Sequence, residues 1–262
     1  MNARSLLYLW DRRSLFIGRL SAPLSLKQGA ACLIVSLEKP IYFRADASDP
    51  YREVQSVLTP AACDHEVDTR GQLVANCMLD PFGEDYAMLR SLMDGAEVAK
   101  NGACFESPYT QVYRSVFKEI YDTDVPFGTA YEMLDSALQT GVSIEDFEYR
   151  VDPRIEMVVY ELKKRVHENL SIEDLAKLAN VSVSRLSQLF RQQTGIPIRR
   201  YRCWHRLFVA SVMMAKTGSL TNAAMVAGFS DASHFNKTFQ AMMGMCPSLL
   251  LSGPHRVQLL VE

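Results

Sequence analysis

Two segments in the second half of the chain carry the same pattern about 48 residues apart. Residues 175–182 (LAKLANVS) match residues 223–230 (AAMVAGFS) position for position. With one extra residue in the second copy, the match continues through Leu186, Phe190, Gly195 and Pro197 in the first and Phe235, Phe239, Gly244 and Pro247 in the second. A repeat of this length indicates one supersecondary unit used twice. Any fold for this chain must therefore contain two similar small helical units.

Each copy has the pattern of a helix-turn-helix. A small residue, Ala176 or Ala224, occupies the position where two helices would cross closely. The turn that follows contains Asn180 or Gly228, residue types that tolerate a left-handed backbone conformation. One such pattern could be an ordinary helical hairpin, but two in tandem favour a DNA-binding domain.

Serine residues mark where these helices begin. Ser171, followed three residues later by Asp174, and Ser182 or Ser230 just before the second helices are N-cap signals. We expect the two units at about 171–195 and 219–244. Between them Pro197 opens a long helix with an apolar side (Ile198, Tyr201, Trp204, Phe208, Val212, Ala215) and an arginine side (Arg199, Arg202, Arg206). We expect arginines 199, 200 and 202 to be solvated rather than bound to phosphate.

The first half of the chain has a different pattern of apolar and polar residues. Its first 80 residues are short apolar runs separated by Asp, Gly, Pro and Ser, which predicts a β meander, sandwich or small barrel. Helical periodicity then predicts helices at 84–100, 106–121 and about 127–140. Asp152 followed by Pro153 is a helix start with an N-cap and a proline at the first position. The domain boundary is therefore expected between about 141 and 153.

Charge divides the chain in the same place. Residues 151–262 hold 14 Lys and Arg against 8 Asp and Glu, a net charge of +6, whereas residues 1–150 hold 14 against 22, a net charge of −8. Only the second part is suited to a polyanion. The contents of 48% apolar and 22% charged residues exclude a disordered chain. No apolar run is long enough to span a membrane, and we expect neither a signal peptide nor membrane association.

The segment from Ala227 to Pro247, AGFSDASHFNKTFQAMMGMCP, resembles the signature of the AraC/XylS family of bacterial transcription regulators. The likeness covers about 155–251 and implies two helix-turn-helix units joined by a long helix. The family usually places a Tyr-Arg pair shortly after the proline, whereas this chain has Ser248-Leu249-Leu250-Leu251. This departure implies that a backbone contact of the family is missing and that the tail packs on the protein.

The resemblance also implies which residues face DNA. In the first unit these are Ser184, Ser187 and Gln188, flanked by Arg185 and Arg191, and in the second they are Ala232, Ser233, Asn236 and Lys237. Gln and Asn can bind adenine bidentately and Lys can donate to guanine, whereas Ser discriminates little between bases. We therefore expect moderate sequence specificity. His234 is expected to pack beside Phe235 rather than to contact a base.

The first half resembles the cupin-like sensor domain common in this family, through residues 15–18, residues 56–65 and LVANCMLDP ending at Pro81. Metal-binding cupins need several converging histidines, and residues 1–150 contain only His65. Residues 25–30 (SLKQGA) stand where many relatives have histidines. We therefore expect no metal and no cofactor. His65 is a weak candidate for an effector contact inside the barrel, and a position on a surface loop is slightly favoured.

Cysteines in the first half allow a second interpretation. Residues 32, 63, 77 and 104 are cysteines, and two of them could form a redox-sensing disulfide if their Cα atoms lie about 4.4–6.8 Å apart. Small apolar fillers in strands are the favoured interpretation. The helices at 84–100 and 106–121 are candidates for a dimer interface, although packing on the barrel explains their apolar stripes equally well.

The sequence thus predicts an α+β protein of two domains. Residues 1–150 form a cupin-like β-barrel with appended helices that binds an effector or mediates dimerisation, and residues 151–262 form an all-α DNA-binding domain. The expected function is a cytoplasmic transcription regulator, a homodimer that binds double-stranded promoter DNA and contacts RNA polymerase. The alternatives are a non-specific architectural DNA binder and a thiol-based redox regulator. An enzyme is not expected, because the chain has no P-loop, G-x-S-x-G or H-E-x-x-H motif.

Overall fold

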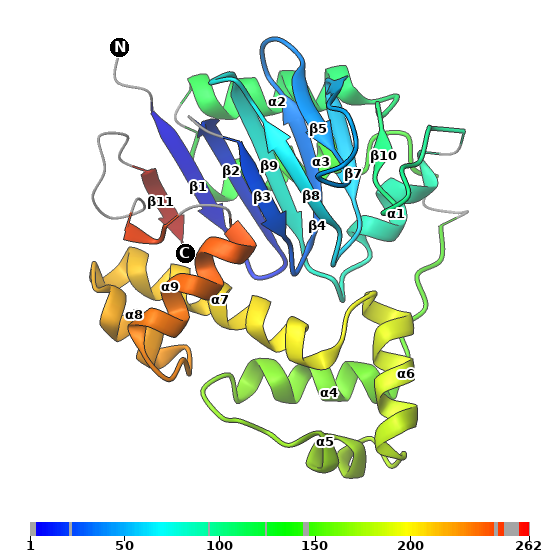
Figure 1. Cartoon of the computed structure of the whole chain (residues 1–262), viewed down its shortest axis with the longest axis vertical. Helices are drawn as coiled ribbons and strands as arrows, with labels where there is room; N and C mark the ends of the chain where they lie inside the picture. Colours follow the sequence, from blue (N-terminus) through cyan, green and yellow to red (C-terminus); the bar gives the residue numbers. More distant parts are fainter. Residues whose placement is uncertain are drawn as a thin grey trace.

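A computed structural model describes residues 4–20, 23–93, 95–123, 125–143, 147–243, 246–248 and 257–261. Two sheets build the first half, and helices build the second (Figure 1). The strands are β1 (Ser5–Leu9), β2 (Arg13–Arg19), β3 (Leu24–Lys27), β4 (Ala31–Ser36), β5 (Ile41–Arg44), β6 (Arg52–Val54), β7 (Ser56–Thr59), β8 (Asp64–Asp68), β9 (Leu73–Leu79), β10 (Cys104–Phe105) and β11 (Val257–Val261).

The first three helices are α1 (Asp85–Ser91), α2 (Thr110–Asp122) and α3 (Phe127–Leu138). The remaining six are α4 (Pro153–Lys164), α5 (Ile172–Leu178), α6 (Val183–Thr194), α7 (Ile198–Thr217), α8 (Leu220–Val226) and α9 (Ala232–Met243). The predicted α+β class is confirmed, with a β-rich first part and a helical second part, but β11 is a strand within the region predicted to be all-α. The cupin-like character of the strands and the boundary at 150/151 stay predictions.

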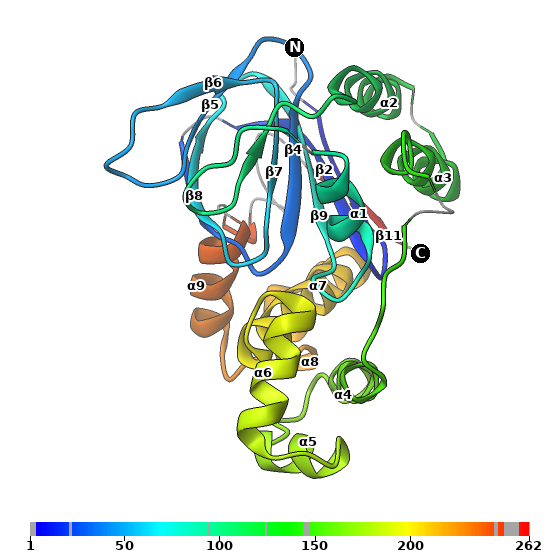
Figure 2. The ribbon, with the colours of Figure 1, turned by 90° about the vertical axis from the view of Figure 1, so that its right-hand side faces the viewer.

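The larger sheet has the strand order β10-β7-β4-β9-β2-β1-β11, and the smaller has β3-β8-β5-β6. The pairs are antiparallel except for β1 and β11, which run parallel with Ser5 opposite Val257. Helices α2 and α3 cover the outer face of the larger sheet, and the smaller sheet lies on its other side (Figure 2). Strand β4 (ACLIVS) is apolar at nearly every position because both of its faces are buried.

The two faces of β4 belong to different parts of the core. Cys32 and Ile34 lie in the cluster between the two sheets, whereas Leu33 and Val35 pack under the helices. Successive residues of a strand point to opposite faces, which explains this division. A third cluster joins Leu7 and Phe16 of the larger sheet to α7, α8 and α9, so one apolar core runs from the first half into the second.

A buried ion pair fixes α1 and α3 to the larger sheet. The guanidinium of Arg13, at the start of β2, donates two hydrogen bonds of 2.7 Å to Asp85 of α1 and one of 2.6 Å to Asp135 of α3. The side chains of Arg13 and Asp85 are each only 8% exposed. Such a fork-shaped contact has the geometry in which a buried pair satisfies its own desolvated charges.

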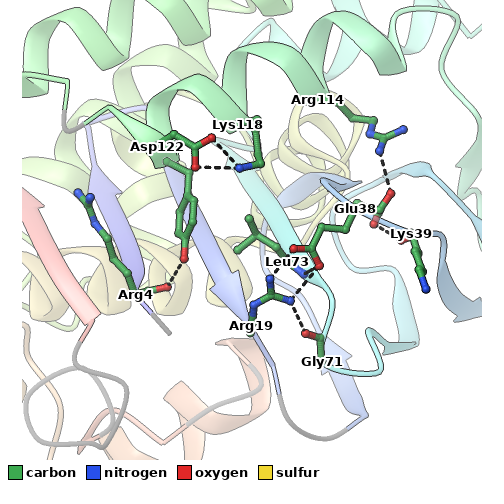
Figure 3. Close-up of polar contacts among 11 residues, drawn as sticks. Arg4, Arg19, Glu38, Lys39, Gly71, Leu73, Arg114, Lys118 and Asp122 are labelled. Atoms are coloured by element: carbon green, nitrogen blue, oxygen red, sulfur yellow. Dashed lines mark hydrogen bonds and ion pairs between the residues drawn. The ribbon is translucent and has the colours of Figure 1, made fainter. Parts of the chain in front are cut away.

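Polar contacts at the sheet edge fix the position of α2 (Figure 3). Glu38 accepts from Arg19 of β2 and from the backbone N–H of Leu73, and the carbonyl oxygen of Glu38 accepts from Arg114 of α2 at 2.8 Å. At the other end of α2, the Tyr121 hydroxyl donates to the carbonyl oxygen of Arg4 at 3.0 Å. Helix α2 is thus held at both ends.

The structure corrects the helix predicted at 84–100. Helix α1 ends at Ser91, Gly95 has a positive φ of 79°, and Val98 forms a β-bridge with Cys104. The predicted helices at 106–121 and 127–140 are confirmed as α2 and α3 with shorter bounds. In the described residues no helix combines the length and apolarity that a membrane crossing requires.

His65 is not on a surface loop, so that favoured expectation is wrong. It lies on β8, is 4% exposed, and stacks on Phe43 with ring centroids 5.1 Å apart. Its Nδ1 lies 3.0 Å from the carbonyl oxygen of Cys63, whereas its buried Nε2 has no hydrogen-bond partner among the described residues. Burial lowers the pKa of His65 to about 4.

Because the unfolded chain takes up a proton on His65 near its ordinary pKa and the folded chain does not, His65 removes stability as the pH falls from about 6.5 to about 4. We expect His65→Phe to reduce this loss by up to about 3 kcal/mol, at about 1.4 kcal/mol for each unit of pKa difference. Urea unfolding between pH 7.5 and pH 4.5 measures it. His167→Phe is the control, since the His167 side chain is 64% exposed; equal pH dependence in both variants would contradict the assignment.

Candidate nucleic-acid interface

The first helix-turn-helix consists of α5 and α6. The side chain of Ser171 accepts from the N–H of Asp174 at 3.0 Å, and that of Ser182 accepts from the N–H of Arg185 at 3.2 Å, so both predicted N-caps are confirmed. Asn180 occupies the turn with a positive φ of 52°. Leu175 and Ala176 of α5 and the apolar side of α6 belong to one buried cluster, which sets the angle between the two helices.

The second unit, α8 and α9, repeats this arrangement with one correction. Asp231, rather than Ser230, accepts from the N–H of His234 at 2.7 Å at the start of α9. The hydroxyl of Ser230 donates to the other oxygen of Asp231 at 2.9 Å. Gly228 forms the turn with a φ of 79°, and a Cβ there would meet the Cα of His167 at 2.9 Å. The turn therefore packs directly against the loop that follows α4.

Helix α7 joins the two units, with α6 near one of its ends and α8 and α9 near the other (Figure 1). A helix of its 20 residues is about 30 Å long. Its buried side carries Trp204, Leu207, Ala210 and Met214. The predicted start after Pro197 is confirmed, but Phe208 and Val212, expected on the apolar side, are only partly buried.

Two arginines of α7 hold the loop after α4 instead of facing solvent. Arg206 is 9% exposed and donates to the carbonyl oxygens of Val166 and Glu168 at 2.9 and 3.0 Å. Arg202 donates to the carbonyl oxygen of Leu170 at 2.7 Å. The expectation that Arg202 is solvated is therefore wrong, because these guanidiniums satisfy carbonyl groups that the loop leaves without backbone partners.

The residues of α6 expected to face DNA lie together on the exposed side of the helix, and Leu186 and Phe190 are buried on the opposite side. The exposed residues are Ser184, Arg185, Ser187, Gln188 and Arg191. Nη1 of Arg185 donates to Oε1 of Gln188 at 2.8 Å, which orients the Gln188 amide. The Ser187 hydroxyl donates to the carbonyl oxygen of Val183 at 2.9 Å. Ser187 therefore has less free hydrogen-bonding capacity than its residue type suggests.

On α9, Ser233, Asn236 and Lys237 are exposed, and Ala232 is partly buried at the first position of the helix. Phe235 and Phe239 face inward with ring centroids 5.6 Å apart. The ring of His234 lies 5.4 Å from that of Phe229 in an edge-on arrangement. Which of these residues contact bases stays a prediction.

The two halves of the chain meet through polar contacts that sequence analysis did not identify. The carboxylate of Asp80, at the end of β9, lies 3.0 Å from Nζ of Lys163 on α4 and 3.4 Å from the hydroxyl of Tyr201 on α7. Burial raises the pKa of Asp80, and Lys163 opposes that shift. Asp64 and Arg200 form a second, more exposed contact at 3.5 Å. In the sequence, the contact of Asp80 is indicated only by the position of Asp80 and Pro81 directly after a buried strand.

The linker adds a connection to α6. Gln193, near the end of α6, donates to the hydroxyl of Tyr149 at 3.1 Å, and Tyr149 donates to the carbonyl oxygen of Phe82 at 3.2 Å. The amide oxygen of Gln193 also accepts from the N–H of Asp152 at 3.2 Å. Through these bonds the position of α6 depends directly on the first half of the chain.

The four cysteines of the first half, at positions 32, 63, 77 and 104, are free and buried. Burial raises the pKa of Cys63 and of Cys77 to about 12. Thiolates are the reactive form in disulfide chemistry, so these surroundings favour the packing interpretation.

Comparisons with known proteins agree with this geometry. A family model described as a helix-turn-helix domain matches residues 175–252. The arabinose operon regulatory protein of Escherichia coli is 33% identical over 86 residues, which cover 32% of this chain and 30% of that protein. The probable transcriptional regulator LumQ of Photobacterium leiognathi is 28% identical over 105 residues, 39% of this chain and 42% of that protein. The chain thus spans less than half of these relatives' length.

Among solved structures, ToxT from Vibrio cholerae is similar over 92% of this chain and 100% of its own, with a TM-score of 0.57 and 13% identity. At that identity the likeness shows the fold alone, which is the same two-part arrangement of strands followed by helices. The C-terminal region is thus a tandem helix-turn-helix domain of the DNA-binding class. Over this region the chain is similar to AraC-type transcription regulators.

Two glycines of this domain allow a test of the turn packing. Gly228 and Gly218 both have a positive φ, of 79° and 65°, but a Cβ at Gly218 would meet no atom within 4 Å. We expect Gly218→Ala to cost about 1–2 kcal/mol from backbone strain. Gly228→Ala should cost about 1–3 kcal/mol more, because backbone atoms of Val166 and His167 must move. Urea unfolding of both variants measures the difference, and equal losses would contradict the packing argument.

Proposed function

We propose that this chain is a sequence-specific transcription regulator that binds two successive major-groove segments of promoter DNA through α6 and α9. The observation that carries the proposal is the pair of similar units fixed to one buried helix, each with a polar exposed side on its second helix. In helix-turn-helix proteins this second helix enters the major groove. Two such helices must be about one helical turn of DNA apart, roughly 34 Å, and α7 is about 30 Å long.

Specificity in this proposal comes from few residues. Gln188 and Asn236 can each bind an adenine through the amide oxygen and nitrogen. Arg185, Arg191 and Lys237 supply positive charge beside them, and phosphate contacts by such side chains add affinity without sequence preference. Ser184, Ser187, Ser233 and Ala232 complete the surface and discriminate less. Moderate specificity follows from this composition.

Control of DNA binding is the second part of the proposal. The first half of the chain contacts both units: Tyr149 bonds to Gln193 of α6, and β3 packs against α9. A small apolar cavity of about 50 Å³ also lies between the larger sheet and α9, lined by Phe16, Met78 and Phe239 among others. One solved ToxT structure is described as bound to an unsaturated fatty acid. We propose that a small effector, or dimerisation through the first half, biases the position of these helices.

Partners and location follow from this role. The proposed regulator acts in the cytoplasm, as a homodimer that contacts RNA polymerase at the promoter. His65 stays a candidate effector contact, because its buried Nε2 has no partner in the described residues. No metal or cofactor is proposed, and the relatives named above are described as regulatory proteins.

The test is selection from a random duplex library with the intact chain at near-physiological salt. We expect enrichment of two short motifs whose centres are about 10 base pairs apart, because α7 fixes the spacing of the two units. Binding without an enriched motif would replace this proposal with a non-specific architectural role. No binding to any duplex would overturn both.

Single substitutions on the enriched duplex test the individual residues. Gln188→Ala and Asn236→Ala should each cost about 1–3 kcal/mol of binding free energy and relax the preference at one base pair. Arg191→Met should weaken binding to all sequences and lower the salt dependence by about one counterion. Gln111→Ala is a matched control, since Gln111 is exposed and lies on α2, outside both helix-turn-helix units. A uniform loss in Gln188→Ala would show that this residue contacts only phosphate.

A further inference from the structure

A cleft of about 770 Å³ lies where the first half of the chain, the linker and the end of α6 meet. The β7–β8 loop, the β9–α1 turn and α1 form one side, and Gln192, Gln193, Thr194 and Gly195 form the other. Its volume is within the range of about 300–1,000 Å³ typical of small-molecule sites. This cleft is separate from the small cavity beside α9, with which it shares no lining residue.

The walls of this cleft combine apolar and aromatic residues with neutral polar residues and one cation. Pro60, Ala61, Pro81, Tyr86 and Tyr149 supply flat or small apolar surfaces. Among the described residues that line the cleft, Arg90 is the only basic one and none is acidic.

Arg90 has no polar partner in the part of the chain that the structure describes. Other partly or fully buried arginines here are paired, as Arg13 is with Asp85 and Arg44 with Glu66. Arg90 is partly buried but takes part in no described ion pair or side-chain hydrogen bond. Its positive charge opposes the rise that burial causes in the pKa of Tyr86 and of Cys104. A guanidinium presents a planar fork of donors that matches a carboxylate. The N–H groups of the Arg90 guanidinium are therefore available to bind an anion in the cleft.

Tyr86 lies one helical turn before Arg90, so both side chains are on the same side of α1 and both line the cleft. Burial raises the pKa of Tyr86 to about 12, so its hydroxyl stays protonated and can donate. Tyr149 lies across the cleft, and its hydroxyl is already bonded to Phe82 and Gln193. On α1 the cleft thus has one charged donor, Arg90, and one neutral donor, Tyr86, and the rings of Tyr86 and Tyr149 supply two aromatic surfaces.

We propose that this cleft is a binding site for a small organic acid, with one carboxylate on Arg90 and an aromatic or other flat apolar body between Tyr86, Tyr149 and the prolines. Such a ligand contacts α1 on one side and the end of α6 on the other. It therefore stabilises the position that α6 has here. This last step rests on the proposed function of α6, whereas binding itself does not.

A second cleft provides an internal comparison. It has a similar volume of about 710 Å³ and lies between Trp10, α3 and α7. Arg12 and Lys216 line it together with Asp11 and Glu132, so its charges are of both signs. A ligand carboxylate is less favoured there, because the acidic residues that line the same cleft repel it. Arg12→Met is therefore a matched control for Arg90→Met.

The test is calorimetric titration of the intact chain with biphenyl-4-carboxylate and with the uncharged biphenyl-4-carboxamide. We expect the carboxylate to bind at least tenfold more tightly than the amide. Arg90→Met should weaken carboxylate binding at least tenfold and leave the weak amide binding unchanged, whereas Arg90→Lys should restore part of the affinity. Arg12→Met should bind as the unmodified chain does. Thermal unfolding without ligand confirms that each variant is folded.

Three outcomes would overturn the site: no binding of the carboxylate, equal binding of carboxylate and amide, or a loss in Arg12→Met instead of Arg90→Met. A further titration measures affinity for the enriched duplex with and without saturating carboxylate. A change of at least threefold in the unmodified chain that is absent in Arg90→Met supports the link to α6, and no change despite carboxylate binding overturns that link alone. Failure of the unliganded chain to bind any duplex would instead overturn the proposed function and leave the site intact.

Discussion

The burial of one side of α7 is the interaction on which the rest of the structure depends. Trp204 packs in the same cluster as the first unit, whereas Leu207, Ala210 and Met214 pack with the second unit and the larger sheet. A single helix thus contributes to both DNA-binding units and to the contact with the first half. Hydrophobic burial is non-directional and does not by itself fix how α7 and its neighbours are oriented. Arg202 and Arg206 of α7 fix the orientation of the loop after α4, because they donate hydrogen bonds to its carbonyl oxygens.

Polar contacts between the two halves of the chain fix their relative position. Asp80 is almost fully buried, and its charge is tolerated because Lys163 lies against it from α4. Removing Lys163 would leave the buried charge of Asp80 without this compensation, which is more costly than losing an exposed ion pair. The contacts of Asp80 connect the end of β9 to α4 and α7, whereas the Tyr149–Gln193 bond connects the first half directly to α6.

Sequence reasoning was most accurate where the determining interactions are local. The N-caps at Ser171 and Ser182, the left-handed turn residues and the start of α7 depend on a few neighbouring residues, and they were predicted correctly. The burial of His65, the early end of α1 and the role of Arg206 depend on partners about 20 to 40 residues away or on the pairing of strands, which periodicity does not encode. The cleft at Arg90 was missed for the same reason, because its walls come from five separate segments.

The last described strand, β11, has a consequence for assembly. The part of the tail at Leu249–Leu251 lies outside the described residues, but β11 beyond it pairs in parallel with β1. Without β11, β1 would be the open edge of the larger sheet, and open edges readily pair with strands of other chains. The chain's own tail therefore competes with any neighbouring molecule for this edge. A second copy could pair with β1 only after displacing this intramolecular ladder, so β11, rather than β1, is the outermost strand that the larger sheet presents to other molecules.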